Sequence, residues 1–166
     1  MTAERTLMLM RHAKSSWKTN DPDLARPLSP RGTRDAVVAG QILAPLPFDL
    51  VLVSPAARAQ QTWQTLQMGG AGAAQVVTVD ALYHARTPGL IAALHQLPEQ
   101  AHRVLVIGHE PTLSDTIVTV AAPSPSRDAV ASRFPTSGIV VLSVPTAWDA
   151  LGSQSTTIAA YEVPRG

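Results

Sequence analysis

Two histidines and two arginines follow three short apolar segments of the chain and could act together on one anion. Arg11 and His12 come directly after the first segment, Arg58 lies one helical turn beyond the second, and His109 follows the third. Arginine presents a planar set of N–H groups that matches phosphate. Histidine can attack phosphorus through a neutral ring nitrogen. We therefore expect these four side chains to bind and attack a phosphoryl group.

The charges of these residues predict how the chemistry is divided among them. A phosphoryl group carries up to about two negative charges, which Arg11 and Arg58 could match with paired hydrogen bonds. Nearby positive charge disfavours a protonated imidazole, so His12 or His109 should stay neutral and could attack phosphorus directly. The arginines and the other histidine would then hold the charge that develops on the phosphoryl oxygens.

Short apolar segments alternate along the chain with longer amphipathic ones, which is typical of strands followed by helices. Strands are predicted at residues 6–10, 50–53, 76–79, 103–107, 139–144 and 156–161. Ser29-Pro30 and Ser54-Pro55 each predict the start of a helix, with the serine as cap and the proline in the first turn. Further helices are predicted at residues 88–97 and 111–120. The proline-containing residues 122–137 are predicted to be irregular and lid-like, and whether they cover the site is left open.

This alternation predicts one α/β domain over residues 1–166, a three-layer α/β/α sandwich with a mainly parallel central sheet of about six strands. Strands that are apolar throughout are typical of a sheet covered on both faces. In such sheets ligands bind at the carboxyl ends of the strands, where helix N-termini also favour anions. Arg11, His12, Arg58 and His109 are therefore expected to meet at one edge of the sheet.

The composition excludes several classes of function. Thirteen basic and twelve acidic side chains leave a net charge of +1, so no broad basic surface for nucleic acid is expected. There is no cysteine, which excludes thiolate catalysis and cysteine-ligated metals. No apolar segment approaches the ~18 residues of a membrane span, and residues 7–10 are too few for a secretory signal. We expect a cytoplasmic protein with neither a nucleic-acid nor a membrane partner.

Three ordered motifs resemble those of the histidine phosphatase superfamily, which includes the phosphoglycerate mutases. Leu9-Met-Arg-His-Ala13 is similar to the stretch that opens these proteins. Val53-Ser-Pro-Ala-Ala-Arg-Ala-Gln-Gln-Thr62 resembles their second element, Ser-Pro-x-x-Arg-Ala-x-Gln-Thr, and Val106-Ile-Gly-His-Glu-Pro111 resembles their third. The resemblance runs from about residue 6 to residue 144 and implies the phosphoglycerate mutase-like fold.

The short chain and three further segments resemble the bacterial SixA-type phosphohistidine phosphatases. These segments are Arg11-His-Ala-Lys-Ser-Ser-Trp17, Arg26-Pro-Leu-Ser-Pro-Arg-Gly32 and Phe134-Pro-Thr-Ser-Gly138. The resemblance implies a phosphatase that needs neither a metal nor another cofactor and that forms a covalent phosphohistidine.

The resemblance also implies a role for each matching residue. His12 would be the nucleophile that becomes phosphorylated, and Arg11, Arg58 and His109 would bind the phosphoryl oxygens. These four residues form the expected catalytic set.

The sequence departs from the larger family members at one catalytic position. They carry a glutamate or aspartate acid just after the third strand, whereas this chain has Leu82-Tyr-His-Ala-Arg86 there, and Asp80 is expected to end the strand. Losing a general acid slows release of an alkoxide by roughly 10²–10⁴-fold, but an imidazole can leave already protonated near neutral pH. The preferred substrate is therefore expected to be phosphohistidine on a partner protein, with His84 as a candidate proton donor or pocket wall.

Two other functions stay open on the sequence alone. One is hydrolysis of a small phosphoester, and the other is a non-catalytic module that binds phosphohistidine. Replacement of His12 separates them, because it would abolish turnover by an enzyme and leave the affinity of a binding module largely intact.

Several residues beside the motifs have less specific roles. Lys14, Arg26 and Ser137 are expected at the rim of the pocket because they lie within the matching segments. Trp17 and Trp63 are expected to pack in a loop and in the core, respectively.

One serine and one glutamate are expected to stabilise helices rather than act in catalysis, and a metal site is disfavoured. Ser54 and Glu110 are expected to cap the helices that follow them. His12, His109 and Asp115 could in principle hold zinc. However, the spacing lacks a His-x-His pair, and the neighbouring arginines would repel a divalent cation.

Overall fold

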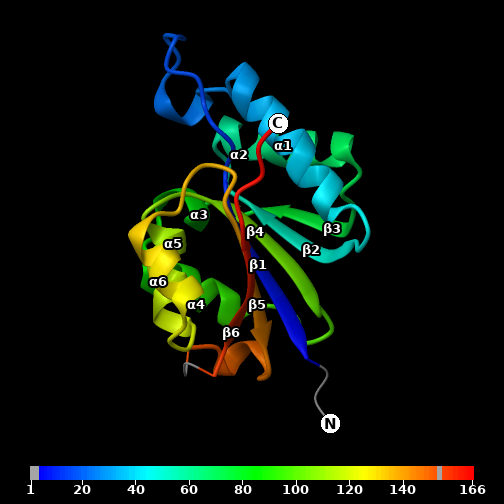
Figure 1. Cartoon of the computed structure of the whole chain (residues 1–166), viewed down its shortest axis with the longest axis vertical. Coiled ribbons are helices and arrows are strands. Elements are labelled where there is room, and N and C mark those ends of the chain that lie inside the picture. Colours follow the sequence, from blue (N-terminus) through cyan, green and yellow to red (C-terminus); the bar gives the residue numbers. More distant parts are fainter. Residues whose placement is uncertain (1–3, 153–154) are drawn as a thin grey trace.

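A six-stranded sheet lies at the centre of the computed structural model, which describes residues 4–152 and 155–166 (Figure 1). The strands are β1 (Arg5–Arg11), β2 (Phe48–Val53), β3 (Ala73–Thr78), β4 (Arg103–Gly108), β5 (Ile139–Val144) and β6 (Thr157–Glu162). Their order across the sheet is β3-β2-β4-β1-β5-β6. Strands β1 to β4 pair in parallel, and β5 is antiparallel to both β1 and β6. The predicted mainly parallel sheet is therefore confirmed.

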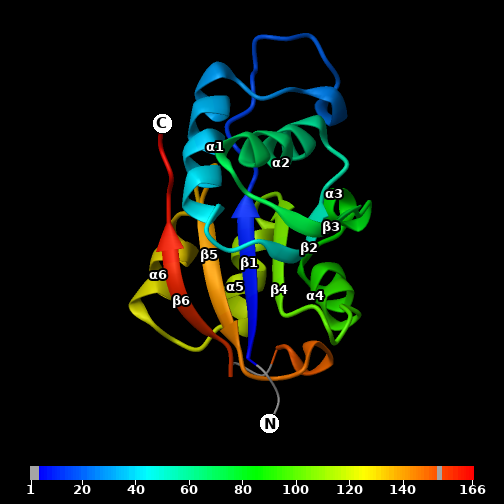
Figure 2. The same ribbon diagram turned by 90° about the vertical axis from the view of Figure 1, so that its right-hand side faces the viewer.

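Helices cover both faces of this sheet, which confirms the three layers expected from the alternating pattern (Figures 1 and 2). One face carries α1 (Pro30–Leu43) and α2 (Ala57–Gly69). The other face carries α3 (Ala81–His84), α4 (Thr87–His95), α5 (Thr112–Val120) and α6 (Pro125–Ser132). Two short 3₁₀ turns complete the elements, η1 (Asp23–Ala25) and η2 (Trp148–Ala150).

The apolar strands build two cores because successive side chains point to opposite faces of a sheet. In β1, Leu7 and Leu9 join the core beneath α4 and α5, whereas Met8 and Met10 join the core beneath α1 and α2. All four side chains are buried. Burial on both sides fixes the register of β1, and with it the position of the residues that follow its carboxyl end.

Helix α1 begins as its sequence predicts. The Ser29 side chain accepts a hydrogen bond from the Gly32 N–H, and Pro30 occupies the first helical position. The prediction of an irregular segment over residues 122–137 is wrong for its middle part, because α6 occupies Pro125–Ser132. Ser124 caps α6 by accepting from the Arg127 N–H. Ser124-Pro125 is therefore the same start signal as Ser29-Pro30, and the other prolines of this segment masked it in the sequence.

The close packing of α1 on α2 gives a first prediction. A Cβ atom added to Gly40 would lie 2.2 Å from the Leu66 carbonyl oxygen, which is backbone and cannot move aside cheaply. Gly40→Ala should therefore lower the free energy of unfolding by about 1–3 kcal/mol. Urea unfolding measures this change. Gly72→Ala is the matched control, because nothing lies within 4 Å of its added Cβ, and equal stability of the two variants would contradict the prediction.

Within the part of the chain that the structure describes, no helix is both long enough and apolar enough to cross a membrane.

Candidate active site

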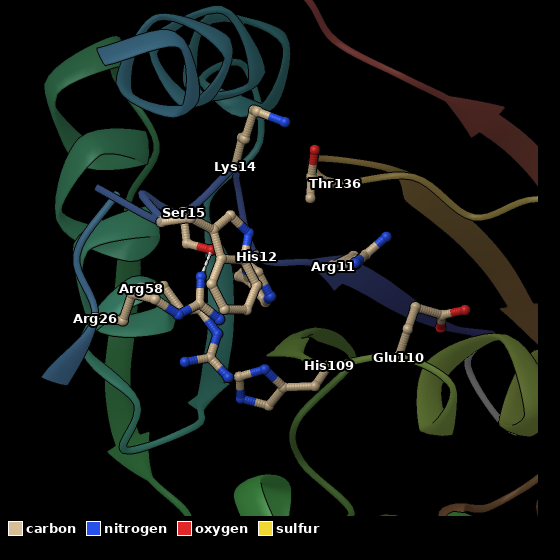
Figure 3. Close-up of a pocket in the computed structure, with 10 residues that line it drawn as sticks. Arg11, His12, Lys14, Ser15, Arg26, Arg58, His109, Glu110 and Thr136 are labelled. Carbon is tan, nitrogen blue, oxygen red and sulfur yellow. Dashed lines mark hydrogen bonds between the residues drawn. The ribbon is translucent and has the colours of Figure 1, made fainter. Parts of the chain in front are cut away.

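The carboxyl ends of β1, β2 and β4 bring the predicted residues to one cavity of about 300 Å³ (Figure 3). The strand ladder sets their positions, since the His12 N–H donates to the Gly108 carbonyl and the Ser54 N–H donates to the Ile107 carbonyl. The cavity is lined by Arg11, His12, Lys14, Ser15, Trp17, Arg26, Arg58, His109, Glu110 and Thr136. The expectation that two histidines and two arginines meet at this edge is met by the geometry.

The two histidines face each other inside the cavity, with their ring centroids 5.1 Å apart. Burial is the main cause that lowers the pKa of His12 to about 3, and the nearby His109, Arg58 and Arg11 lower it further. Burial, followed by the charge of Arg58, lowers the pKa of His109 to about 4. Both rings are therefore neutral at neutral pH, as expected, but removal from water contributes more than the arginine charges do.

The hydrogen bond of His12 determines which of its ring nitrogens is free. Its Nδ1 lies 2.7 Å from the Ala13 carbonyl oxygen, which can only accept. Nδ1 must therefore carry the proton, and in a neutral ring Nε2 then holds the lone pair. The Ala13 N–H in turn donates to the Thr62 hydroxyl, which anchors this turn of the chain to α2. His12 thus has a nucleophilic nitrogen that needs no deprotonation before attack.

Ser54 has a different role from the predicted helix cap. The N-cap of α2 is Ala56, two residues further on, and it makes no side-chain capping bond. The Ser54 hydroxyl instead lies 2.7 Å from His109 Nε2 and also accepts from the Ala56 N–H. Ser54 therefore fixes the orientation of the His109 ring, which lies 5.7 Å from the ring of Tyr83 between centroids.

Buried neutral histidines predict that the fold loses stability in acid. In the unfolded chain these rings become protonated as the pH falls below about 6.5. In the folded chain they stay neutral as the pH falls to about 3 for His12 and about 4 for His109. The unfolded state then binds more protons, so the free energy of unfolding rises with pH between about 4 and 6.5 and does not change above this range through these groups. The slope approaches about 1.4 kcal/mol per pH unit for each ring.

Urea unfolding between pH 4.5 and 7.5 measures this slope. Replacing both His12 and His109 with glutamine should flatten it, because glutamine does not titrate. His102→Gln is the matched control, since His102 is exposed, and it should keep the slope of the original chain. A double variant as sensitive to acid as the original would contradict the assignment of two neutral rings.

Arg58 is buried, with 6% of its surface exposed, and it contacts a residue that the sequence analysis missed. Its Nη1 donates to the Asp23 carbonyl oxygen at 2.8 Å, and its Nη2 donates to the Asp23 carboxylate at 3.2 Å. The Tyr83 hydroxyl donates to the same carboxylate at 2.6 Å, and Arg26 pairs with its other oxygen at 3.3 Å. The Tyr83 hydrogen bond, supported by Arg58 and Arg26, lowers the pKa of Asp23 to about 2.

Asp23 therefore holds Arg58 in place beside the cavity, which gives a further prediction. Asp23→Asn should raise KM for a phosphorylated substrate by up to about 5-fold, in line with the upper end of the 0.2–1 kcal/mol typical of a partly exposed ion pair. Asp21→Asn, two residues away on an exposed part of the same loop, should leave KM unchanged. A lower KM for Asp23→Asn would instead show that Asp23 competes with the substrate for Arg58.

The other arginine of the predicted catalytic set, Arg11, also lines the cavity, as do Lys14 and Arg26, two residues predicted at its rim. Arg11 donates from Nη1 to the Phe134 carbonyl oxygen at 3.2 Å, and in Figure 3 its side chain extends toward Glu110 and Thr136. Lys14 is exposed at the opening. Arg26 donates to the Ser15 hydroxyl, and its guanidinium lies 3.7 Å from the centroid of the Trp17 ring. Both side chains line the cavity, Lys14 as an exposed residue and Arg26 as a buried one, so only Lys14 has the exposure expected of a rim residue.

Two other predicted residues lie outside the cavity. Ser137 is fully buried, and its N–H donates to the carbonyl oxygens of Arg11 and His12, so it supports the backbone of the site and Thr136 lines the cavity in its place. His84 is exposed, and its ring packs edge-on against Tyr83 at 4.8 Å between centroids. Because α3 turns Tyr83 toward His109, Tyr83 rather than His84 approaches the site from this segment.

The N-cap residue of α5 is Pro111 rather than Glu110, but the Glu110 side chain accepts from an N–H of the first helical turn and also lines the cavity. Its carboxylate accepts hydrogen bonds from both the N–H and the hydroxyl of Ser114. Asp115, the third residue of the disfavoured zinc site, lies on α5 and lines a separate cavity. Across residues 4–152 and 155–166, no cluster of three or more histidine, aspartate or glutamate side chains could hold a metal ion.

The chain is similar in sequence to one family and to bacterial relatives. Residues 7–87 match the sequence model of one family, the histidine phosphatase superfamily (branch 1). An uncharacterised protein of Mycobacterium tuberculosis is 40% identical over 162 residues, which cover 94% of this chain and 100% of that protein.

Two solved structures are similar to the chain in both fold and sequence. A proposed SixA phosphohistidine phosphatase from Nakamurella multipartitia superimposes with a TM-score of 0.87 and 32% identity, over 98% of this chain and 97% of the other. A second proposed SixA phosphohistidine phosphatase, from Agrobacterium tumefaciens, gives a TM-score of 0.76 and 30% identity, over 96% and 99%.

Proposed function

The chain belongs to the histidine phosphatase superfamily and is a phosphatase, and from this premise we propose that it hydrolyses phosphohistidine on a cytoplasmic partner protein through a phosphorylated His12. The observation that carries the proposal is the neutral His12 ring, whose free Nε2 lies in a cavity shared with His109 and Arg58. Similarity to two proposed SixA phosphohistidine phosphatases supports the substrate class.

The reaction proceeds in two displacements at phosphorus. In the first, Nε2 of His12 forms a bond to phosphorus while the bond from phosphorus to the substrate's imidazole nitrogen breaks, and the leaving imidazole keeps the electron pair and takes a proton. In the second, the oxygen of water forms a bond to phosphorus while the bond from phosphorus to Nε2 of His12 breaks. The electron pair of that bond returns to Nε2, water gives up a proton to solvent, and phosphate and the neutral ring are released. Arg58, Arg11 and His109 stabilise the equatorial oxygens during both steps.

The acidic groups near the cavity favour an imidazole leaving group over an alkoxide. Among the residues that line the cavity around His12, Glu110 carries the one carboxylate, and it accepts a hydrogen bond from Ser114. Asp23 lies behind Arg58, and its low pKa keeps it ionised. Glu110 is therefore held as an acceptor by Ser114 and Asp23 is ionised, so neither carboxylate is a ready proton donor for an alkoxide. A phosphohistidine releases an imidazole that can be protonated by solvent near neutral pH.

Rates on three substrates test this substrate class. We expect kcat/KM for a phosphohistidine peptide to exceed that for an alkyl phosphoester by at least about 10²-fold, because the alkoxide lacks a general acid. Para-nitrophenyl phosphate should fall between them, since nitrophenolate leaves without help. Faster hydrolysis of the alkyl phosphoester would overturn the phosphohistidine assignment and favour a small-molecule substrate.

A further inference from the structure

A second cavity of about 440 Å³ borders the phosphoryl cavity and is rich in cations. It shares Arg11, Lys14, Glu110 and Thr136 with the phosphoryl cavity. We call it the basic cleft, and its complete lining is Arg11, Lys14, Arg31, Glu110, Arg133, Phe134, Pro135, Thr136 and Arg165. Because the two cavities share four lining residues, a group bound at His12 lies next to the basic cleft.

The basic cleft concentrates positive charge in a chain whose net charge is only +1. Five of its lining side chains are cationic and one, Glu110, is acidic. The Glu110 carboxylate already accepts two hydrogen bonds from Ser114. Lys14 and Arg133 are exposed and have no carboxylate partner among the residues that the structure places. These cations are therefore available to an anion from outside the chain.

The fold builds this cleft from distant segments and fixes two of its arginines. The C-terminal tail after β6 runs beside α1 (Figures 1 and 2), where the Gly166 N–H donates to Asp35 at 2.9 Å. Arg165 pairs with Asp35 at 3.4 Å and donates to the Thr136 carbonyl oxygen at 3.0 Å. Asp35 is only 1% exposed and also lies 3.8 Å from Arg31. A buried carboxylate thus anchors two of the exposed cations at the wall of the cleft.

We propose that the basic cleft binds acidic side chains that flank the phosphohistidine on the partner protein. The proposal rests on the proposed function and adds the chemistry by which the partner is selected. The exposure of Lys14, Arg31, Arg133 and Arg165 fits a polypeptide surface better than a small metabolite, which would need enclosing walls. Opposite charges across such an interface speed association and select partners.

Paired peptides test the proposal. One phosphohistidine peptide carries glutamates on both sides of the phosphohistidine, and the other carries glutamines at the same positions. With the full chain at low ionic strength, kcat/KM should be about 10-fold higher for the acidic peptide, from several exposed charge pairs of modest strength. Raising the salt to about 0.5 M should reduce this ratio toward one, because exposed charges are screened.

Matched variants locate the effect in the basic cleft. The double variant Arg31→Gln/Arg133→Gln should lower the ratio of acidic to neutral peptide to about 2 or less. The control Arg34→Gln/Arg127→Gln removes the same charge from α1 and α6 at positions that do not line the cleft, and it should keep the full ratio. Reporting a ratio within each variant separates partner selection from any general loss of activity.

Three results would overturn the proposal. The first is equal rates on both peptides by the original chain, and the second is loss of the ratio in the control variant as well. The third is a cleft variant that lowers the ratio of kcat/KM for phosphoglycolate to kcat/KM for ethyl phosphate but leaves the ratio for the two peptides unchanged. That result would assign the cleft to a small substrate with a second anionic group. Hydrolysis of the neutral peptide reports on the proposed function independently, since this peptide does not need the cleft.

Discussion

Replacing His12 with asparagine should reduce kcat by at least about 10⁴-fold and abolish the covalent intermediate, because no other ring nitrogen takes the place of Nε2. Asparagine is chosen because its amide N–H can still donate to the Ala13 carbonyl oxygen, as Nδ1 of His12 does. The fold of the turn should therefore survive while the nucleophile is lost. Steady-state hydrolysis of a phosphohistidine peptide measures the loss.

Two measurements make this result interpretable. His102→Asn, at an exposed histidine far along the chain, should keep full activity and controls for loss of an imidazole. The His12→Asn variant should still bind a phosphohistidine peptide, because Arg58 and His109 are still present. Calorimetry measures this binding. If the original chain binds the peptide without turning it over, the protein is a binding module and the enzymatic account fails.

Replacing Arg58 should have the second-largest effect, since its buried side chain lines the cavity in which the proposed mechanism develops charge on the phosphoryl oxygens. Arg58→Ala should lower kcat/KM by about 10²–10³-fold, as loss of one oxyanion donor typically does. Arg58→Lys should recover only part of this loss, because an ammonium group cannot make two parallel hydrogen bonds. Kinetics with a phosphohistidine peptide at fixed ionic strength measure both variants.

Chemical rescue distinguishes a catalytic role of Arg58 from a structural one. Added guanidinium ion should restore activity to Arg58→Ala but have no such effect on Asp23→Asn, which keeps the arginine. Arg34→Ala is the control for loss of an exposed arginine and should show neither the loss nor the rescue. An Arg58→Ala enzyme with near-normal kcat/KM would contradict the placement of Arg58 at the phosphoryl oxygens.

Much of the fold and the main contacts of the site follow from local patterns in the sequence. Apolar strands with side chains buried on both faces are visible as unbroken runs, and Ser29-Pro30 marks the start of α1 where the structure has it. The four proposed catalytic residues could be found because each lies at or just after the end of a strand or, for Arg58, in the first turn of the helix that follows one. Parallel strands then bring their carboxyl ends to one edge of the sheet without further information.

Contacts between distant loops could not be predicted in this way. Asp23 lies among loop residues with no periodic pattern, and only the folded loop places its carboxylate against Arg58 and Tyr83. Ser54 has the residue type and the neighbouring proline of a helix cap, but α2 begins later and leaves its hydroxyl free to contact His109. The α3 turn likewise decides which of Tyr83 and His84 faces the site, which the sequence order alone does not reveal.

Trapping the phosphoenzyme tests the central claim most directly. The chain is mixed with a phosphohistidine peptide labelled with radioactive phosphate, quenched rapidly in alkali, in which phosphohistidine is stable, and digested for peptide mapping. The account predicts acid-labile label on the peptide that contains His12, and none in His12→Asn. Label on His109, or no labelled protein with any phosphate donor that the chain hydrolyses, would contradict it.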